Sequence, residues 1–217
     1  PLFEQPSTAN FQLQVNSPCI DAGDTDSPVD PDDSRADMGA YYTHSGISQV
    51  KILISEINYS SANNYDSGDW IELYNYSDST IDINSWKMVH GFDNYTFERV
   101  PKIPAREYLV ICQDSTKFLQ MHPDVKAIVG DFNFDLNSKG NISIYNANNE
   151  LAYRLSYDSI WPWASLPNGK GATLELDKIS SDNSISQWRE SYILMGTPGK
   201  LNSERPKIDK IYINEVM

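Results

Sequence analysis

Short runs of alternating hydrophobic and polar residues, separated by turn-forming residues, fill the middle of the chain. The runs are rich in Ile, Val, Tyr and Trp, which is typical of β-strands with one buried face. They lie at residues 51–59, 69–76, 80–83, 85–89, 95–100, 107–113, 127–132, 141–147, 151–157 and 172–178. Residues 114–123 instead have apolar side chains at helical spacing before Pro123, which predicts one or two turns of helix.

The segments between these runs carry Asn, Asp, Ser and Gly, as in SSANNYDSGD at 60–69 and PNGKG at 167–171. Gly and Asn accept positive φ, and Asn and Asp side chains bond their own backbone, so these segments are predicted to be turns. Many strands at short spacing with almost no helix favour an all-β protein built as an antiparallel β-sandwich.

Changes in composition predict three zones along the chain. Residues 1–45 hold one short alternating run, FQLQV, and then an Asp-rich loop with Pro and Gly. Residues 46–203 hold the predicted strands, and residues 204–217 begin as a polar linker and end in the strand-like KIYINEVM. The chain begins with Pro1 rather than Met, and we expect it to be a piece of a longer protein.

The end of the chain repeats the start of the middle zone. KILISEIN at 51–58 and KIYINEVM at 210–217 have Lys, two Ile and Glu at the same four places. Both stretches follow a linker, so the match predicts a tandem repeat in which a second copy of the domain begins near residue 210.

The acidic composition restricts the partners of this chain. The formal net charge is −13 and the sequence pI is about 4.5, so a nucleic-acid backbone would be repelled. Cations and carbohydrate remain compatible partners. No window of about 18 apolar residues is present, and we expect no membrane insertion. Cys19 and Cys112 are predicted to be either two buried thiols or a single disulfide.

The Asp-rich loop has two interpretations. Carboxylates at this density repel one another unless they are solvated or neutralised, and Ca²⁺ accepts six to eight oxygen ligands. The candidate calcium ligands are Asp24, Asp26, Asp30, Asp32 and Asp33. The alternative is a solvated loop that uses Asx turns, with Arg35 paired locally, and the loop lacks the spacing of an EF-hand.

Two glutamates on predicted strands, Glu56 and Glu72, raise the alternative of a glycosidase-like carboxylate pair. Glu56 has a counterpart in Glu215, however, and a residue that recurs with the module is expected to serve its fold, by accepting backbone N–H groups or pairing with a base. The three His share no metal-ligand spacing, and the sequence has no nucleophile elbow, catalytic cysteine signature or phosphate loop. We therefore predict that the chain is not an enzyme.

The middle zone resembles a lamin tail domain at several consecutive motifs. These are ILISEIN, with Ser55 where the family often has Asn, GDWIELYN from Gly68 to Asn75, SDSTIDINSW from Ser77 to Trp86, and GTPGKLN from Gly196 to Asn202. The resemblance implies an immunoglobulin-like β-sandwich. It also implies, for a bacterial protein, an accessory or surface-attached domain of secreted enzymes and adhesins, and hence an extracellular or cell-surface location.

The first zone carries a second resemblance. SPCIDAGD, the Asp-rich loop and RADMGAYY are similar to the last coil and cap of a right-handed parallel β-helix of the pectate-lyase-like kind. The resemblance implies that residues 1–45 are a β-helix-cap-like extension before the sandwich.

Tryptophans are the remaining candidates for a binding surface. Trp70 and Trp86 belong to the family's signature strands, which implies packing in the core. Trp161 and Trp163 lie in a Pro-containing loop, IWPWASLPNG, and are the candidate ligand-binding residues because an exposed indole can stack on a sugar. We expect both of these residues to be partly exposed.

Taken together, these features predict a non-catalytic structural or binding module of a large secreted or cell-surface bacterial protein. It would bind a protein or a glycan, or act as a spacer between neighbouring domains. The alternatives are an accessory segment of a polysaccharide-active β-helix enzyme and a carbohydrate-binding module. No cofactor is required, and calcium is the one candidate ion.

Overall fold

The computed structural model describes residues 1–8, 10–14, 17–29, 35–39, 51–178 and 185–206. The chain divides into two compact units, Pro1–Ser48 and Gln49–Met217. In the first unit, β1 (Phe3–Gln5) and β2 (Asn10–Leu13) form an antiparallel two-stranded sheet around the 3-10 turn η1 (Pro6–Thr8). The described residues of this unit contain no coil of a parallel β-helix, so the β-helix cap stays a prediction.

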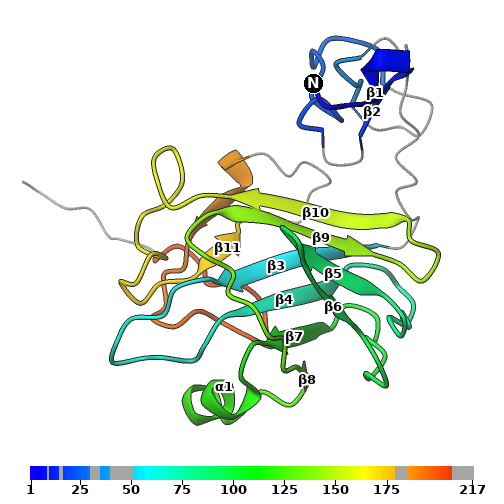
Figure 1. Ribbon diagram of the computed structural model, residues 1–217. Helices are drawn as coiled ribbons and strands as arrows, with labels where there is room; N and C mark the ends of the chain where they lie inside the picture. Colours follow the sequence, from blue (N-terminus) through cyan, green and yellow to red (C-terminus); the bar gives the residue numbers. More distant parts are fainter. Residues whose placement is uncertain (9, 15–16, 30–34, 40–50, 179–184, 207–217) are drawn as a thin grey trace, which may run out of the picture. The chain divides into compact units, whose positions relative to one another are not determined.

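The second unit is strand-rich and consists of two sheets, with the four-stranded sheet lying over the six-stranded sheet (Figure 1). In spatial order, the six-stranded sheet contains β12 (Trp188–Glu190), β11 (Leu174–Leu176), β3 (Ile52–Asn58), β4 (Trp70–Asn75), β7 (Tyr108–Cys112) and β8 (Ile128–Val129). The four-stranded sheet contains β10 (Leu151–Tyr157), β9 (Gly140–Tyr145), β5 (Lys87–His90) and β6 (Asp93–Thr96). Within these sheets every pair is antiparallel except β7–β8. This arrangement agrees with the predicted all-β sandwich.

The main core lies between the two sheets. Ile71 and Leu73 of β4 pack in it with Ile142 and Leu155 of the four-stranded sheet, and all four side chains are fully buried. The alternation of the WIELYN stretch places Ile71 and Leu73 on the same face, as the sequence pattern predicts. Each such side chain contributes about 1.5–3 kcal/mol to folding through burial.

The outer face of the six-stranded sheet is also covered. The helix α1 (Ser115–Met121) places Phe118 against Trp70, Val110 and Cys112 in a second buried cluster. Asp114 caps this helix by accepting a hydrogen bond from the Lys117 N–H at 2.9 Å. Cover on both faces explains why every residue of β3 and β4 is buried.

The predicted burial of Trp70 and Trp86 is confirmed: Trp70 lies under α1 and Trp86 lies in the main core. Cys112 is a buried free thiol, and Cys19 is a half-buried free thiol. None of the helices in the described ranges is long and apolar enough to cross a bilayer.

The elements of the second unit differ from the predictions at several places. The strand β12 was not predicted, and β6 begins at Asp93, two residues before the predicted run at 95–100. Residues 80–83 form only an isolated bridge, Ile81 to Ile103, instead of a strand. In this region the Asn84 side chain takes the place of a backbone partner. Its amide oxygen accepts the Val100 N–H at 3.0 Å, and its amide nitrogen donates to the Val100 carbonyl at 3.1 Å.

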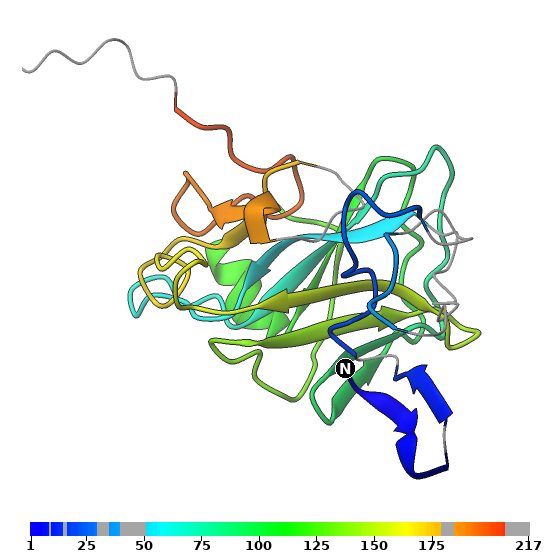
Figure 2. The ribbon, with the colours of Figure 1, turned by 90° about the horizontal axis from the view of Figure 1, so that it is seen from above.

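Three connecting segments meet at one end of the sandwich (Figure 2). They are the β3–β4 loop (59–69), the β10–β11 loop (158–173) and the chain after β12 (191–199), and we call them together the loop end. The Gly169 N–H donates to the Ser60 carbonyl at 3.1 Å, and the Met195 N–H donates to the Gly171 carbonyl at 2.7 Å. The loop end is therefore one continuous surface.

Candidate functional site

Three glutamates form a row across adjacent strands of the six-stranded sheet. Glu56 of β3 is the register partner of Glu175 on β11 and of Glu72 on β4. All three are fully buried. They lie on the outer face, away from the main core, because Ile71 and Leu73 take the inner face of β4.

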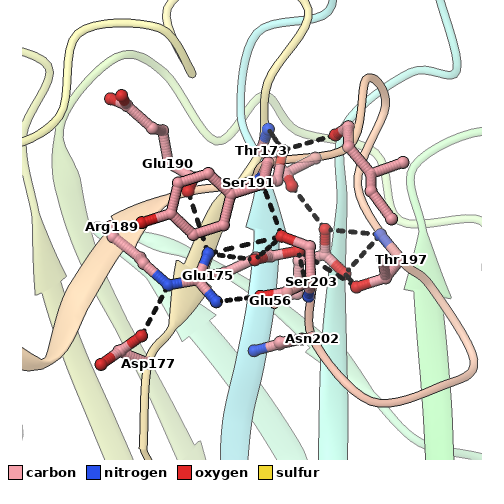
Figure 3. A network of polar contacts seen from close by, with 12 residues as sticks. Glu56, Thr173, Glu175, Asp177, Arg189, Glu190, Ser191, Thr197, Asn202 and Ser203 are labelled. Atoms are coloured by element: carbon pink, nitrogen blue, oxygen red, sulfur yellow. Dashed lines mark hydrogen bonds and ion pairs between the residues drawn. The ribbon is translucent and has the colours of Figure 1, made fainter. Parts of the chain in front are cut away.

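A single segment of chain, residues 197–203, closes over the three carboxylates, and Figure 3 shows its Thr197 and Ser203 beside Glu56 and Glu175. The Thr197 N–H donates to both oxygens of Glu56, at 3.0 and 3.1 Å. The Gly199 N–H donates to Glu72 Oε2, and Ser203 donates to Glu175 through its N–H and through its hydroxyl, the latter at 2.6 Å. We call residues 197–203 the closing segment.

Among the residues that the structure describes, one base pairs with this row of carboxylates. Arg189 of β12 contacts Glu175 Oε2 through Nη1 at 2.6 Å and Asp177 Oδ1 through Nε at 2.7 Å, and Figure 3 shows it bridging the two. It also donates to the Ser203 carbonyl, so the base and the closing segment share Glu175. The Glu175–Arg189 ion pair is buried on the carboxylate side and mostly buried on the guanidinium side.

Burial decides the protonation of the other two glutamates. Desolvation, and then the neighbouring charges of Glu72 and Glu175, raise the pKa of Glu56 well above its ordinary value. Desolvation likewise raises the pKa of Glu72 to about 8, although hydrogen bonds from Ser55 and Gly199 oppose the shift. Burial therefore favours the protonated forms of Glu56 and Glu72, whereas Glu175 pairs with Arg189.

The row of glutamates is closed to any substrate. A Cβ placed on Gly196, whose φ is +75°, would lie 1.8 Å from Glu56 Oε1, so the chain passes directly over the carboxylate. Acid–base catalysis needs a carboxylate within hydrogen-bond reach of a substrate, and these carboxylates are occupied by the protein's own donors. This geometry supports the structural role predicted for Glu56. The sequence did not indicate that Glu175 and Arg189 join it.

The structure places the two candidate tryptophans in different environments. Trp161 is 89% exposed on the β10–β11 loop, and Ile160 and Leu166 of the same loop are also exposed. Trp163 is half-buried and packs against the main core. A bond from the Trp163 N–H to the Ile160 carbonyl, at 3.0 Å, fixes the turn between them. A stacking surface in this loop therefore depends on Trp161.

The candidate calcium ligands lie only partly within the described residues. Asp24 and Asp26 are described, whereas Asp30, Asp32 and Asp33 fall outside. Asp24 Oδ1 accepts the Asp26 N–H at 3.0 Å, which is an Asx turn, and Arg35 Nε donates to the Gly23 carbonyl. In the part of the chain that the structure describes, no three His, Cys, Asp or Glu side chains are grouped to hold a metal ion.

We expect EDTA to leave the melting midpoint of the chain unchanged. The Asx turn at Asp24 and the local bond of Arg35 match the solvated-loop interpretation, in which no ion stabilises the native state. Thermal melts with chelator and with millimolar CaCl₂ measure this, because an ion that binds only the native state must raise stability. A midpoint that rises with calcium and falls back with EDTA would instead support a calcium site.

The loop end also holds a polar pocket that the sequence did not predict. Its volume is about 290 Å³, and it is lined by Ser61, Asn63, Asp66, Gly68, Asp69, Gln113 and Lys117. The β3–β4 loop supplies five of these residues, and β7's continuation into α1 supplies the other two. The turn-forming composition of residues 60–69 gave no signal that they would surround a cavity.

The sandwich fold and its closed glutamate row define a strand-rich, immunoglobulin-like module. The family model of the lamin tail domain matches residues 46–159, which is more than half of the chain. The chain belongs to the lamin tail domain family, whose immunoglobulin-like domains are generally non-catalytic. No curated protein matches this chain.

Proposed function

We propose that this chain is a non-catalytic recognition module of a larger secreted or cell-surface protein, and that it binds a protein or a glycan through its loop end. The observation that carries the proposal is the 89% exposure of Trp161. A tryptophan side chain can bury about 150–250 Å² in a contact, and leaving it in water forgoes that stabilisation.

The surroundings of Trp161 favour a binding surface over a plain spacer. Ile160 is 67% exposed next to it, and Leu166 is also exposed in the same loop. Exposed apolar side chains that gather at one place mark interaction sites, and tryptophan is enriched among the residues that dominate binding energy. The loop is anchored to the β3–β4 loop through Gly169, so the indole is presented from a fixed support.

The charge of the chain narrows the class of partner. A net charge of −13 opposes binding to a phosphate backbone, so we exclude nucleic acid from the proposal. A neutral glycan meets no such repulsion, and an indole face stacks on the apolar face of a sugar ring. Protein partners that present a basic rim around an apolar pocket fit equally.

Replacing Trp161 with Ala is expected to weaken retention on the cognate glycan or protein by about tenfold or more, since the loss of an anchoring tryptophan costs about 1.4 kcal/mol or more. A glycan array identifies the ligand, and affinity electrophoresis or surface plasmon resonance measures the change. Phe92→Ala is the matched control, because Phe92 is a fully exposed aromatic on the β5–β6 turn. Its retention should equal that of the wild type.

The other outcomes of this experiment separate the alternatives. Equal loss in both variants would mean non-specific adsorption to aromatic side chains and would contradict the proposal. Retention on no glycan and no surface protein would favour a spacer. Polysaccharide cleavage that requires this chain and an upstream β-helix together would favour an accessory segment of an enzyme.

A further inference from the structure

The polar pocket at the loop end is built around one half-buried carboxylate. Asp69 Oδ2 accepts the Leu136 N–H at 2.8 Å, and the Asp69 carbonyl accepts the Gln113 N–H at 2.8 Å. The first bond holds the side chain and the second holds the backbone of Asp69, each from a separate segment. Within the described ranges its other oxygen, Oδ1, accepts no hydrogen bond, although Asp69 lines the pocket. The pocket therefore offers a fixed, unused acceptor.

The basic residue in the lining of the pocket is Lys117, and an ion pair with Asp66 balances its charge. Lys117 Nζ contacts Asp66 Oδ2 at 2.9 Å, and both side chains are about half exposed. An ammonium group has three N–H donors, and this ion pair uses one of them. Lys117 thus keeps donors for a ligand without giving the pocket a positive charge.

The remaining lining adds polar groups and no apolar ones. Gln113 Nε2 is already held by the Phe134 carbonyl at 3.0 Å and by Asp135 Oδ1 at 2.6 Å, so its amide is fixed. Asn63 is exposed at the rim. The Ser61 hydroxyl already accepts from the Asn58 amide at 2.8 Å and from the Ser67 N–H at 3.3 Å, so it is held within the β3–β4 loop. A volume of about 290 Å³ accommodates one small ring-sized ligand.

This combination selects one class of ligand. An apolar ligand would remove water from Asp69 Oδ1 and from the remaining Lys117 donors without replacing their hydrogen bonds, which costs about 1–3 kcal/mol for each group. An anion would face Asp66, Asp69 and a net charge of −13. A metal ion lacks a set of three ligands here, since no such group exists among the described residues. Hydroxyl groups donate and accept together, so a neutral polyhydroxylated ring satisfies both the free acceptor and the free donors.

We propose that this pocket binds one neutral sugar residue, with Asp69 Oδ1 accepting from its hydroxyls and Lys117 donating to them. The inference rests on the proposed recognition function and names its ligand as a glycan. The pocket and the Trp161 loop belong to the same surface, because Gly169 bonds Ser60 at 3.1 Å across the two loops. A glycan chain that lies over the loop end would fill the pocket with one residue and stack another on the indole.

Titration of the ¹⁵N-labelled chain with glucose, galactose, mannose and glucuronate tests the pocket directly. With at least one neutral sugar we expect amide shifts confined to 61–69 and 113–117, saturating at millimolar concentrations, where binding is worth about −4 kcal/mol. Glucuronate should bind at least about tenfold more weakly than the matching neutral sugar because of the acidic lining.

Two variants assign the contacts. Asp69→Asn keeps the shape and the bond to Leu136 and should weaken sugar binding about tenfold, because the charge-assisted hydrogen bond is lost. Lys117→Met should also weaken it. Lys102→Met is the control, since Lys102 forms an exposed ion pair with Asp82 outside the pocket and should leave the titration unchanged.

Three results would overturn the assignment: no shifts with any neutral sugar up to about 100 mM, equal binding of glucuronate, or unchanged binding in Asp69→Asn. The sugar-binding pocket and the Trp161 surface are separate proposals, and the experiments can contradict either one without the other. Trp161→Ala should lose retention on polysaccharide while keeping the monosaccharide shifts at 61–69. Trp161-dependent retention without any monosaccharide shift would contradict the pocket alone, and pocket shifts with no effect of Trp161→Ala would contradict the loop alone.

Discussion

Replacing Arg189 with Met is expected to lower the free energy of unfolding by about 3–5 kcal/mol. Arg189 supplies the positive charge that contacts the fully buried Glu175, at 2.6 Å, and it also binds the Ser203 carbonyl. Its removal leaves a buried carboxylate beside Glu56 and Glu72 with no compensating charge. Losing one partner of a buried ion pair is far more costly than losing an exposed pair.

Urea denaturation of the wild type and the variant measures this change. Arg106→Met is the matched control, because Arg106 forms an ion pair with Asp78 at a similar distance, 2.7 Å, and both of these side chains are largely exposed. Its loss should cost less than about 1 kcal/mol. Equal losses for the two variants would contradict the idea that Arg189 is the counter-charge of the glutamate row.

Raising the pH from about 5 to about 9 is expected to destabilise the domain by a few kcal/mol. In the unfolded chain a glutamate titrates near 4.3, whereas burial raises the pKa of Glu72 to about 8 and that of Glu56 well above its ordinary value. Between those pH values the native state binds more protons than the unfolded state, so the free energy of unfolding falls as the pH rises. The stabilising contribution is fully present below about pH 4 and is lost as the pH rises through the native pKa of about 8.

Urea titrations at pH 5, 7 and 9 measure the free energy of unfolding. Glu72→Gln should reduce its dependence on pH, because the variant lacks one of the two carboxyl groups with a raised pKa. Asp82→Asn is the control. Asp82 is exposed, and hydrogen bonds from Asn84 and Lys102 lower its pKa to about 2. Its contribution to the free energy of unfolding is therefore lost only as the pH falls below about 4. A free energy of unfolding that stays level or rises between pH 5 and 9 would show that the buried glutamates ionise without cost.

The strands could be predicted from the sequence because the alternating pattern that identifies each strand lies within the strand's own residues. Residues 51–59 and 69–76 alternate strongly enough to give β3 and β4 within one or two residues. The burial of Glu56 and Glu72 could not be read in the same way. A polar residue on a strand predicts an open face, and that face is covered here by Thr197, which lies 141 positions after Glu56. Only the GTPGKLN motif pointed to this part of the chain.

The binding surface was predictable by residue type and not by geometry. Two tryptophans in one Pro-containing loop were equivalent in the sequence, yet Trp163 packs on the core and Trp161 stays in water. Which of them is exposed depends on contacts with distant strands. The polar pocket depends in turn on Gln113 and Leu136 reaching Asp69 from segments 44 and 67 residues away. The positions of these side chains depend on contacts between distant parts of the chain, and no periodic pattern in the sequence indicates them.

The closing segment also determines how this domain carries mechanical load. Thr197, Gly199 and Ser203 bond side chains on β3, β4 and β11, whereas β12 is the edge strand of that sheet. Tension that arrives along the chain at Ser203 therefore acts first on the bonds between Ser203 and Glu175, and only afterwards on those of Gly199 with Glu72 and of Thr197 with Glu56. Each of these contacts joins the closing segment to a strand inside the sheet, so the segment must be released before those strands are uncovered.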